Sequence, residues 1–265
     1  MLMFRPTMLA CAFAALSASV SQAQEIEAAP SPHGVVAIGA GVAPEFDGSK
    51  DVRVLPAILA DIRWRGVNVQ VGGQGLRADI VSNSRLAFGP VLGVRLPRDD
   101  ADGRIGLLPE IDTAIEAGAF VGYRFGGNEG GQGALETELS VVQDVSGAHD
   151  GLLATARVSY FAIRSDTFSL SLDARTTWVN QDYARTYFGV TPAEAVASGL
   201  AAYRPGSGIR DVGMSLTAGY WFSPRIGVMG AVGANYLVGD FADSPVTDEG
   251  RRWQPMGALT VAYRF

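Results

Sequence analysis

The feature that most constrains the fold is a period of two that persists over unusually long segments. Between 167 and 181, Phe168 and Leu170 alternate with Ser169 and Ser171, and the alternation continues to the end of the segment. Several such segments run 11 to 15 residues, whereas strands of globular proteins centre near about five or six. A tilted strand needs at least about 9 to 11 residues to cross a bilayer. The pattern therefore predicts strands with lipid on one face and a polar lumen on the other, and their length argues against a soluble β-sandwich.

About twelve segments share this alternation. They span 34–43, 52–64, 66–73, 75–82, 85–96, 113–125, 134–145, 151–164, 167–181, 211–222, 225–238 and 252–265. Long connections alternate with tight ones, as in bacterial barrels, where the long loops are external and the turns periplasmic. We therefore predict an all-β fold, a transmembrane antiparallel β-barrel of about 12 strands with both ends in the periplasm.

The first residues predict export. Arg5 precedes an apolar run from Met8 to Val20, and Ser21-Gln22-Ala23 supplies small residues for a signal peptidase. That run is shorter than the roughly 20 residues of a spanning helix. We expect a signal peptide over 1–23 and a barrel over 24–265, located in the bacterial outer membrane.

Composition limits the chemistry that the mature chain can perform. The only cysteine, Cys11, lies in the expected signal, so cysteine nucleophiles and cysteine metal sites are excluded. His33 and His149 have no partner that the sequence predicts, and we interpret both as incidental surface residues. The acidic loop 100–103 lacks the ligand spacing of a calcium-binding hand. A net charge of −6 argues against nucleic acid as a partner, and we predict no catalytic residue, metal or cofactor.

Charged residues of both signs fall on the expected lumen face. They are Arg85, Arg95, Glu116, Arg124, Glu136, Glu138, Asp144, Arg157, Asp173, Arg175, Arg252 and Arg264. Such a lining can form a salt-bridged plug or a narrow pore, and the sequence leaves both open. At the C-terminus, Leu259, Val261, Tyr263 and Phe265 share the outer face. We interpret this last pattern as the signal that the barrel assembly machinery recognises.

One long connection, 182–210, contains a predicted helix. Thr191-Pro192-Ala193-Glu194 has the pattern of a capping box with proline at the first helical position, and Gly199 is a stop signal. We expect the apolar stripe Ala193, Val196, Ala197 and Leu200 to pack on the barrel mouth or inside it, because so short a helix is unstable alone in water. Two roles remain open, a structural lid and a gate.

The same connection carries a resemblance to a known family. The stretch Tyr187, Phe188, Gly189, Val190, Thr191, Pro192, Ala193, Glu194 and Ala195, followed by Ser198, Gly199, Leu200 and Tyr203, resembles the MipA/OmpV family of outer-membrane proteins. Support comes from Gly39, Gly41, Pro44, Gly48 and Ser49 near the N-terminus. Phe46 stands where the family pattern has tyrosine.

The resemblance implies a scaffold that links a lytic transglycosylase to a peptidoglycan synthase. With no catalytic set predicted, our first hypothesis is a non-enzymatic scaffold or structural protein of the outer membrane. The alternative is a narrow channel for small polar solutes, gated by the 182–210 loop. A third hypothesis, an outer-membrane hydrolase, lacks a serine or aspartate predicted beside a histidine.

Overall fold

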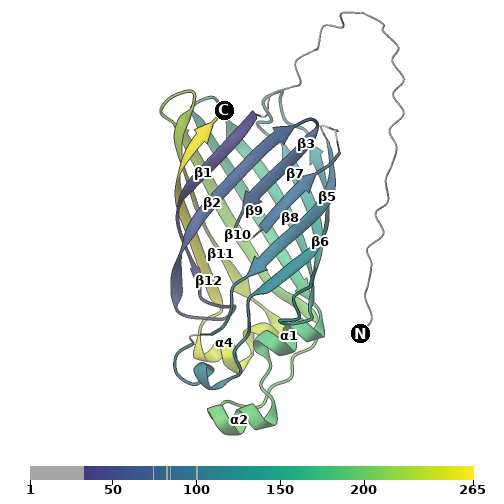
Figure 1. The fold of residues 1–265 in the computed structure, drawn as a ribbon, viewed down its shortest axis with the longest axis vertical. Helices are drawn as coiled ribbons and strands as arrows, with labels where there is room; N and C mark the ends of the chain where they lie inside the picture. The colour runs from purple at the N-terminus through teal and green to yellow at the C-terminus, as the bar shows by residue number, and fades with distance from the viewer. Residues whose placement is uncertain (1–32, 74, 82, 84, 100) are drawn as a thin grey trace, which may run out of the picture.

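A computed structural model describes residues 33–265 except 74, 82, 84 and 100. The expected signal peptide, 1–23, lies outside the described residues. The chain forms a closed antiparallel barrel of twelve strands, each paired with its neighbours in sequence, and β1 pairs with β12 to close it (Figure 1). The predicted fold class is confirmed.

The strands follow the predicted segments. They are β1 (His33–Pro44), β2 (Val52–Trp64), β3 (Val67–Gly72), β4 (Gly75–Asp79), β5 (Leu86–Arg95), β6 (Ala114–Phe125), β7 (Leu135–Asp144), β8 (Leu152–Arg164), β9 (Phe168–Val179), β10 (Gly208–Trp221), β11 (Ile226–Leu237) and β12 (Trp253–Arg264). The largest differences are in β4, which ends at Asp79 instead of 82, and in β10, which begins at Gly208 instead of 211; β9 ends before the predicted residue 181.

The two ends of the barrel differ. One end, the loop end, carries the connections 45–51, 96–113, 145–151, 180–207 and 238–252. The other, the turn end, carries the tight connections together with the start of β1 and the C-terminus (Figure 1). The helices lie at the loop end: η1 (Ile105–Leu107), α1 (Gln181–Phe188), α2 (Pro192–Ser198), α3 (Gly239–Ala242) and α4 (Pro245–Glu249). Among the described helices, none is long and apolar enough to cross a membrane.

The outer face of the wall is apolar. Ile38, Val54, Met214, Leu259 and Val261 are each more than half exposed, on strands around the barrel. Such a surface is unfavourable in water and suits contact with lipid. Exposed aromatic side chains gather at the turn end, where they form an interfacial girdle. They are Trp64, Tyr123, Phe125, Tyr160, Tyr220, Phe222, Tyr263 and Phe265.

A glycine permits the closing pair of strands to approach closely. A Cβ at Gly39 of β1 would lie 2.0 Å from the carbonyl oxygen of Leu259 on β12. Any larger residue would therefore push the two strands apart along the β1–β12 ladder, which runs from Val35↔Arg264 to Val42↔Gly257. This close approach gives a physical reason for the glycine in the N-terminal motif.

Candidate functional site

Helix α1 closes the loop end of the barrel. Asn180 caps it by accepting a hydrogen bond from the backbone N–H of Tyr183. The helix buries Tyr183, Tyr187 and Phe188, each at most 1% exposed, against residues of α3 and the adjoining strands. We call α1, α3, α4 and the connection 45–51 the plug. Helix α1 was not predicted, although Asn180 followed by Asp182 is a recognisable helix start.

A buried polar network fixes the plug to the inside of the barrel. Asp47, from the connection after β1, accepts hydrogen bonds from Arg210 (Nη1–Oδ2, 2.8 Å) and Arg95 (Nη1–Oδ2, 3.3 Å), as well as from the Tyr183 hydroxyl. Each arginine has a second carboxylate. Arg95 donates to Glu116 (Nε–Oε1, 2.9 Å) and Arg210 to Asp211 (Nε–Oδ2, 2.6 Å).

The network holds Asp47 ionised and Tyr183 neutral. Burial alone would raise the pKa of the Asp47 carboxyl, but Arg210 and Arg95 outweigh it, so this pKa lies below its ordinary value. Burial raises the pKa of the Tyr183 hydroxyl well above its ordinary value. Tyr183 therefore remains a hydrogen-bond donor to a carboxylate, and the arrangement is that of a structural ion cluster.

His149 belongs to the same region, which corrects its interpretation as a surface residue. Its side chain is buried, with Nε2 3.3 Å from Glu116 Oε1 and the ring edge-on to Tyr183 and Tyr187. Nδ1 accepts a hydrogen bond from the backbone N–H of Gly151 at 3.0 Å. Glu116 lies on β6, a different strand from the two that the connection carrying His149 joins, so the local sequence contained no signal for this pairing. His33 is exposed at the start of β1.

Other charged residues of the expected lumen stabilise loops and edges instead. Asp144 accepts hydrogen bonds from the backbone N–H groups of Ser146, His149 and Asp150, and so shapes the connection 145–151. Arg252 forms an ion pair with Asp243 at 3.2 Å in the loop end. The expectation that these two line the lumen is wrong, because each lies where a strand meets a loop.

Arg264 at the turn end lies over the ring of Trp221, with its guanidinium carbon 3.9 Å from the ring centroid. Arg264 lines neither of the two lumen cavities described below, and it forms no ion pair with a described residue.

Helix α2 has the predicted start and stop but not the predicted buried face. Thr191 and Glu194 form the capping box, and Gly199 ends the helix at φ 73°. Val196 is 88% exposed, whereas Leu200 is buried and Ala195 packs with it. The predicted stripe is wrong in this respect, because α2 lies on η1 outside the barrel rather than in its lumen (Figure 1).

The two motif segments meet in the plug. The backbone N–H of Gly48 donates to the Gln254 side chain, and the Gln254 amide donates to the carbonyl of Ser49. A Cβ at Gly48 would contact Thr247 of α4 and Phe188 of α1. In the 182–210 loop, Val190 pairs with Tyr203 through two backbone hydrogen bonds. The motif residues therefore pack against one another, although about 140 residues separate the segments.

Between the plug and the turn end, the lumen contains two overlapping cavities of about 360 and 600 Å³. Seven predicted lumen residues line them: Arg85, Arg124, Glu136, Glu138, Arg157, Asp173 and Arg175. Arg95 and Glu116, also predicted, lie in the plug network instead. Neither lining includes a residue of the plug. Three residues at the turn end, Arg63, Asn83 and Arg85, line the smaller cavity, and Arg63 also lines the larger one.

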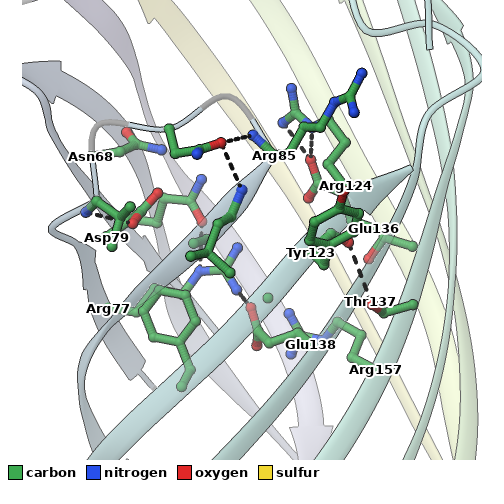
Figure 2. A pocket seen from close by; sticks show the side chains of 18 of the residues that line it. Asn68, Arg77, Asp79, Arg85, Tyr123, Arg124, Glu136, Thr137, Glu138 and Arg157 are labelled. Atoms are coloured by element: carbon green, nitrogen blue, oxygen red, sulfur yellow. Dashed lines mark hydrogen bonds and ion pairs between the residues drawn. The ribbon is translucent and has the colours of Figure 1, made fainter. Parts of the chain in front are cut away.

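Some of the lumen charges near the turn end are paired. Figure 2 shows Arg77 of β4 directed at Glu138 of β7, and Arg124 of β6 beside Glu136 of β7; both ion pairs link different strands of the wall. Arg77 also donates to Gln70 at 2.6 Å, and Ser159 donates to Asp173 at 2.5 Å. Arg77 was not among the predicted lumen residues, although it lies on the predicted segment 75–82.

The predicted assembly signal faces outward. Leu259, Val261, Tyr263 and Phe265 are each 42% to 66% exposed on the lipid side of β12 and its end. Their recognition by the assembly machinery stays a prediction.

A closed twelve-stranded wall with an apolar exterior and a charged lumen defines a β-barrel of the bacterial outer membrane. The chain belongs to the MipA family, because the family model for MltA-interacting protein MipA matches residues 36–265.

Solved outer-membrane proteins share the barrel fold at low identity. An outer-membrane channel from Pseudomonas putida F1 matches with a TM-score of 0.46 and 11% identity, covering 93% of this chain and 100% of that one. A bacterial polysaccharide outer-membrane secretin matches with a TM-score of 0.41 and 10% identity over 88% and 98% of the two chains. OmpT, an outer-membrane protein of Vibrio cholerae, matches with a TM-score of 0.36 and 8% identity over 89% and 97%. None of the curated protein sequences matches this chain.

Proposed function

We propose that this barrel is a non-enzymatic scaffold that binds a lytic transglycosylase, and with it a peptidoglycan synthase, through its turn end. The observation that carries the proposal is the burial of Tyr187 and Phe188, the start of the family motif, in the plug. Because Tyr187 and Phe188 are at most 1% exposed, they are unavailable to a partner and serve instead to close the loop end. The family description names an interaction with MltA, and the turn end is the face left for it.

The turn end has the charge to dock an acidic surface. Its exposed arginines include Arg65, Arg85 and Arg225 on three separate connections, and the acidic side chains there are fewer. The loop end, by contrast, exposes many carboxylates, such as Asp99 and Asp182. Opposite charge steers association and sets which face is used, so this asymmetry favours docking at the turn end. The proposal places that end in the periplasm, as the loop lengths and the even strand count predict.

A binding assay on the whole barrel tests the scaffold. The barrel is placed in nanodiscs, and a purified MltA-type lytic transglycosylase and a peptidoglycan synthase are titrated by biolayer interferometry. We expect saturable binding of the transglycosylase that weakens at least tenfold in the double variant Arg85→Glu with Arg225→Glu. Arg104→Glu, a reversal at a 59% exposed position of the loop end, is the matched control and should bind as wild type. No binding by wild type, or equal loss in both variants, would overturn the proposal.

The non-enzymatic part has its own test. His149 beside Glu116 is the one described pairing that resembles a base with a carboxylate. Hydrolysis of phospholipid or peptide substrates by the purified wild type, abolished in His149→Ala, would contradict a purely structural role.

A second function is a narrow channel gated by the 182–210 loop. The cavities in the lumen between the plug and the turn end favour it. In a planar bilayer, this function requires ion conductance that rises when 187–203 is deleted. If the deletion variant folds and its conductance stays at baseline, the channel function is ruled out.

A further inference from the structure

All twelve strands pair into a closed barrel, but two of them, β3 and β4, are only six and five residues long. β2 pairs with β3 only from Ala60 to Trp64, and β4 pairs with β5 only over Gly75–Arg77. The residues 52–59 of β2 keep β1 on one edge, but no described strand pairs with their other edge. The wall therefore has a lateral gap between β2 and β5, from the tip of the β3–β4 hairpin toward the loop end, where strands of the far wall are visible in Figure 1.

The gap lies within the lipid-facing part of the wall. Val54 and Ile58 on β2 are 73% and 55% exposed on the outer face, and Leu92 on β5 is 50% exposed. An open strand edge in hydrocarbon leaves backbone N–H and C=O groups without partners, which costs several kcal/mol per group. Such an edge persists where it borders a polar cavity. Pro56 removes one of these N–H groups, which is the usual place for proline in a sheet.

The larger cavity reaches this gap. Its lining includes Gly72, Gly73 and Gly75 at the hairpin tip, with Leu76 beside them and Val91 of β5. A Cβ placed at Gly73 would have no atom of a described residue within 4 Å, so the described part of the tip leaves open space. A ligand can therefore extend from the lumen past the tip toward the lipid.

The cavity is apolar at the gap and cationic in its interior. Ala60, Val71, Leu76 and Val91 line the part beside the gap. The whole lining contains six arginines and four carboxylates, a net charge of +2, although the chain carries −6. An apolar entrance that leads to excess positive charge matches an amphiphile with an anionic headgroup.

Arg157 is an arginine of this lining whose guanidinium has unused hydrogen-bonding capacity. It lies opposite Arg175 on β9 and opposite Glu138 on β7. Glu138 is paired with Arg77, and Arg157 makes no hydrogen bond or ion pair with any described residue. Like charges directly opposite in a sheet are destabilising, and a guanidinium removed from bulk water requires an anionic or hydrogen-bonding partner. An anion between these arginines would supply that partner.

We propose that the cavity binds a single-chain lysophospholipid with an anionic headgroup, which enters through the gap between β2 and β5. Its phosphate lies among Arg77, Arg157 and Arg175, and its acyl chain passes the hairpin tip into the membrane. This site is independent of the scaffold, because it uses the lumen and the lateral wall rather than the surface of the turn end.

The test follows the acyl chain at the gap. With Cys11→Ser in the background, Ala57→Cys places a bimane fluorophore on the unpaired edge of β2, and Ala231→Cys on β11 is the matched control away from the gap. The barrel, in phosphatidylcholine nanodiscs, is titrated with lysophosphatidylglycerol carrying a nitroxide on its chain. We expect saturable quenching at position 57, and only weak, non-saturable quenching at 231. Equal saturable quenching at both positions would overturn lateral entry.

Headgroup recognition is tested in the same titration. Arg157→Gln should weaken saturable quenching about tenfold or more, as expected for loss of a charged hydrogen bond, and Arg157→Lys should retain most of it. Because Arg157 has no partner among the described residues, Arg157→Gln should fold, which heat-modifiable migration in SDS gels checks. Lysophosphatidylcholine with the same chain should bind at least tenfold more weakly. Equal binding of both lipids, an unchanged Arg157→Gln, or displacement by inorganic phosphate at equal concentration would overturn the proposal.

Discussion

Removing the Asp47 carboxylate should unlock the plug. Three donors converge on Asp47 Oδ2: Arg210 at 2.8 Å, Arg95 at 3.3 Å and the Tyr183 hydroxyl. Removing one member of a buried ion pair costs about 3 to 5 kcal/mol. The lower end of this energy range applies to the loss of the Asp47 carboxylate, because the Asp47 side chain is 26% exposed and each arginine keeps a second carboxylate.

A loss of about 3 kcal/mol raises the ratio of open to closed plug about 100-fold. The measurement is the fraction of time that purified Asp47→Ala conducts ions in a planar bilayer, compared with wild type. Asp243→Ala is the matched control, since this carboxylate is 69% exposed and forms one ion pair, with Arg252 at 3.2 Å. Exposed pairs contribute about 0 to 1 kcal/mol, so the control should change conduction less than about fivefold.

Two results would refute the reasoning. Conduction by Asp47→Ala no greater than that of Asp243→Ala would show that this carboxylate does not hold the plug closed. Continuous conduction by wild type would show that the plug is not a seal. Heat-modifiable migration of both variants in SDS gels establishes that the barrel wall has folded, so that a change in conductance reports on the plug.

Three further outcomes follow from single contacts. The pKa of Asp47 lies below its ordinary value of 3.8. The ionised carboxylate therefore stabilises the closed plug fully above pH 3.8, and this stabilisation is lost as the pH falls through the lowered pKa. Wild-type conductance should therefore stay low from pH 7 to 4 and rise at lower pH, with a smaller acid-induced rise in Asp47→Asn; identical pH profiles would contradict this. Gly39→Ala should reduce the folded fraction in SDS gels because its Cβ meets the Leu259 carbonyl, whereas Gly230→Ala, whose Cβ meets nothing closer than 3.9 Å, should fold normally. Thr191→Ala removes the capping box and should cost about 0.5 to 2 kcal/mol, measured as faster amide hydrogen exchange over 192–198; unchanged exchange would count against the cap.

The strands were predictable because lipid and lumen impose their pattern locally. Every second residue of a segment such as 167–181 must suit hydrocarbon, so a period of two is visible without tertiary contacts. The seven lumen residues that line the cavities follow from the same rule. The capping box at Thr191 is also local, because its residues lie three apart.

The plug was not predictable, because its contacts join residues far apart in sequence. Asp47 and Arg210 are separated by 163 residues, and neither position has a local pattern that indicates the other. His149 was misinterpreted for the same reason. The lateral gap depends on the length of the β3–β4 hairpin. The glycines at the tip of this hairpin indicated a turn, but not how far the hairpin extends along the wall from the turn end.

The plug and the cavity should be coupled through Arg175. Arg175 lines the cavity, donates to Asn235 at 2.9 Å, and is attracted by Asp211 and Asp47 of the plug network. An anionic headgroup beside Arg175 competes for that attraction, so ligand binding should favour the open plug, and an open plug should in turn bind the lipid more tightly. Saturating lysophosphatidylglycerol should therefore raise the conductance of wild type but not of Arg157→Gln, and Asp47→Ala should show saturable quenching at lower lipid concentration. Full quenching at position 57 with no change in conductance would mean that the cavity and the plug act independently.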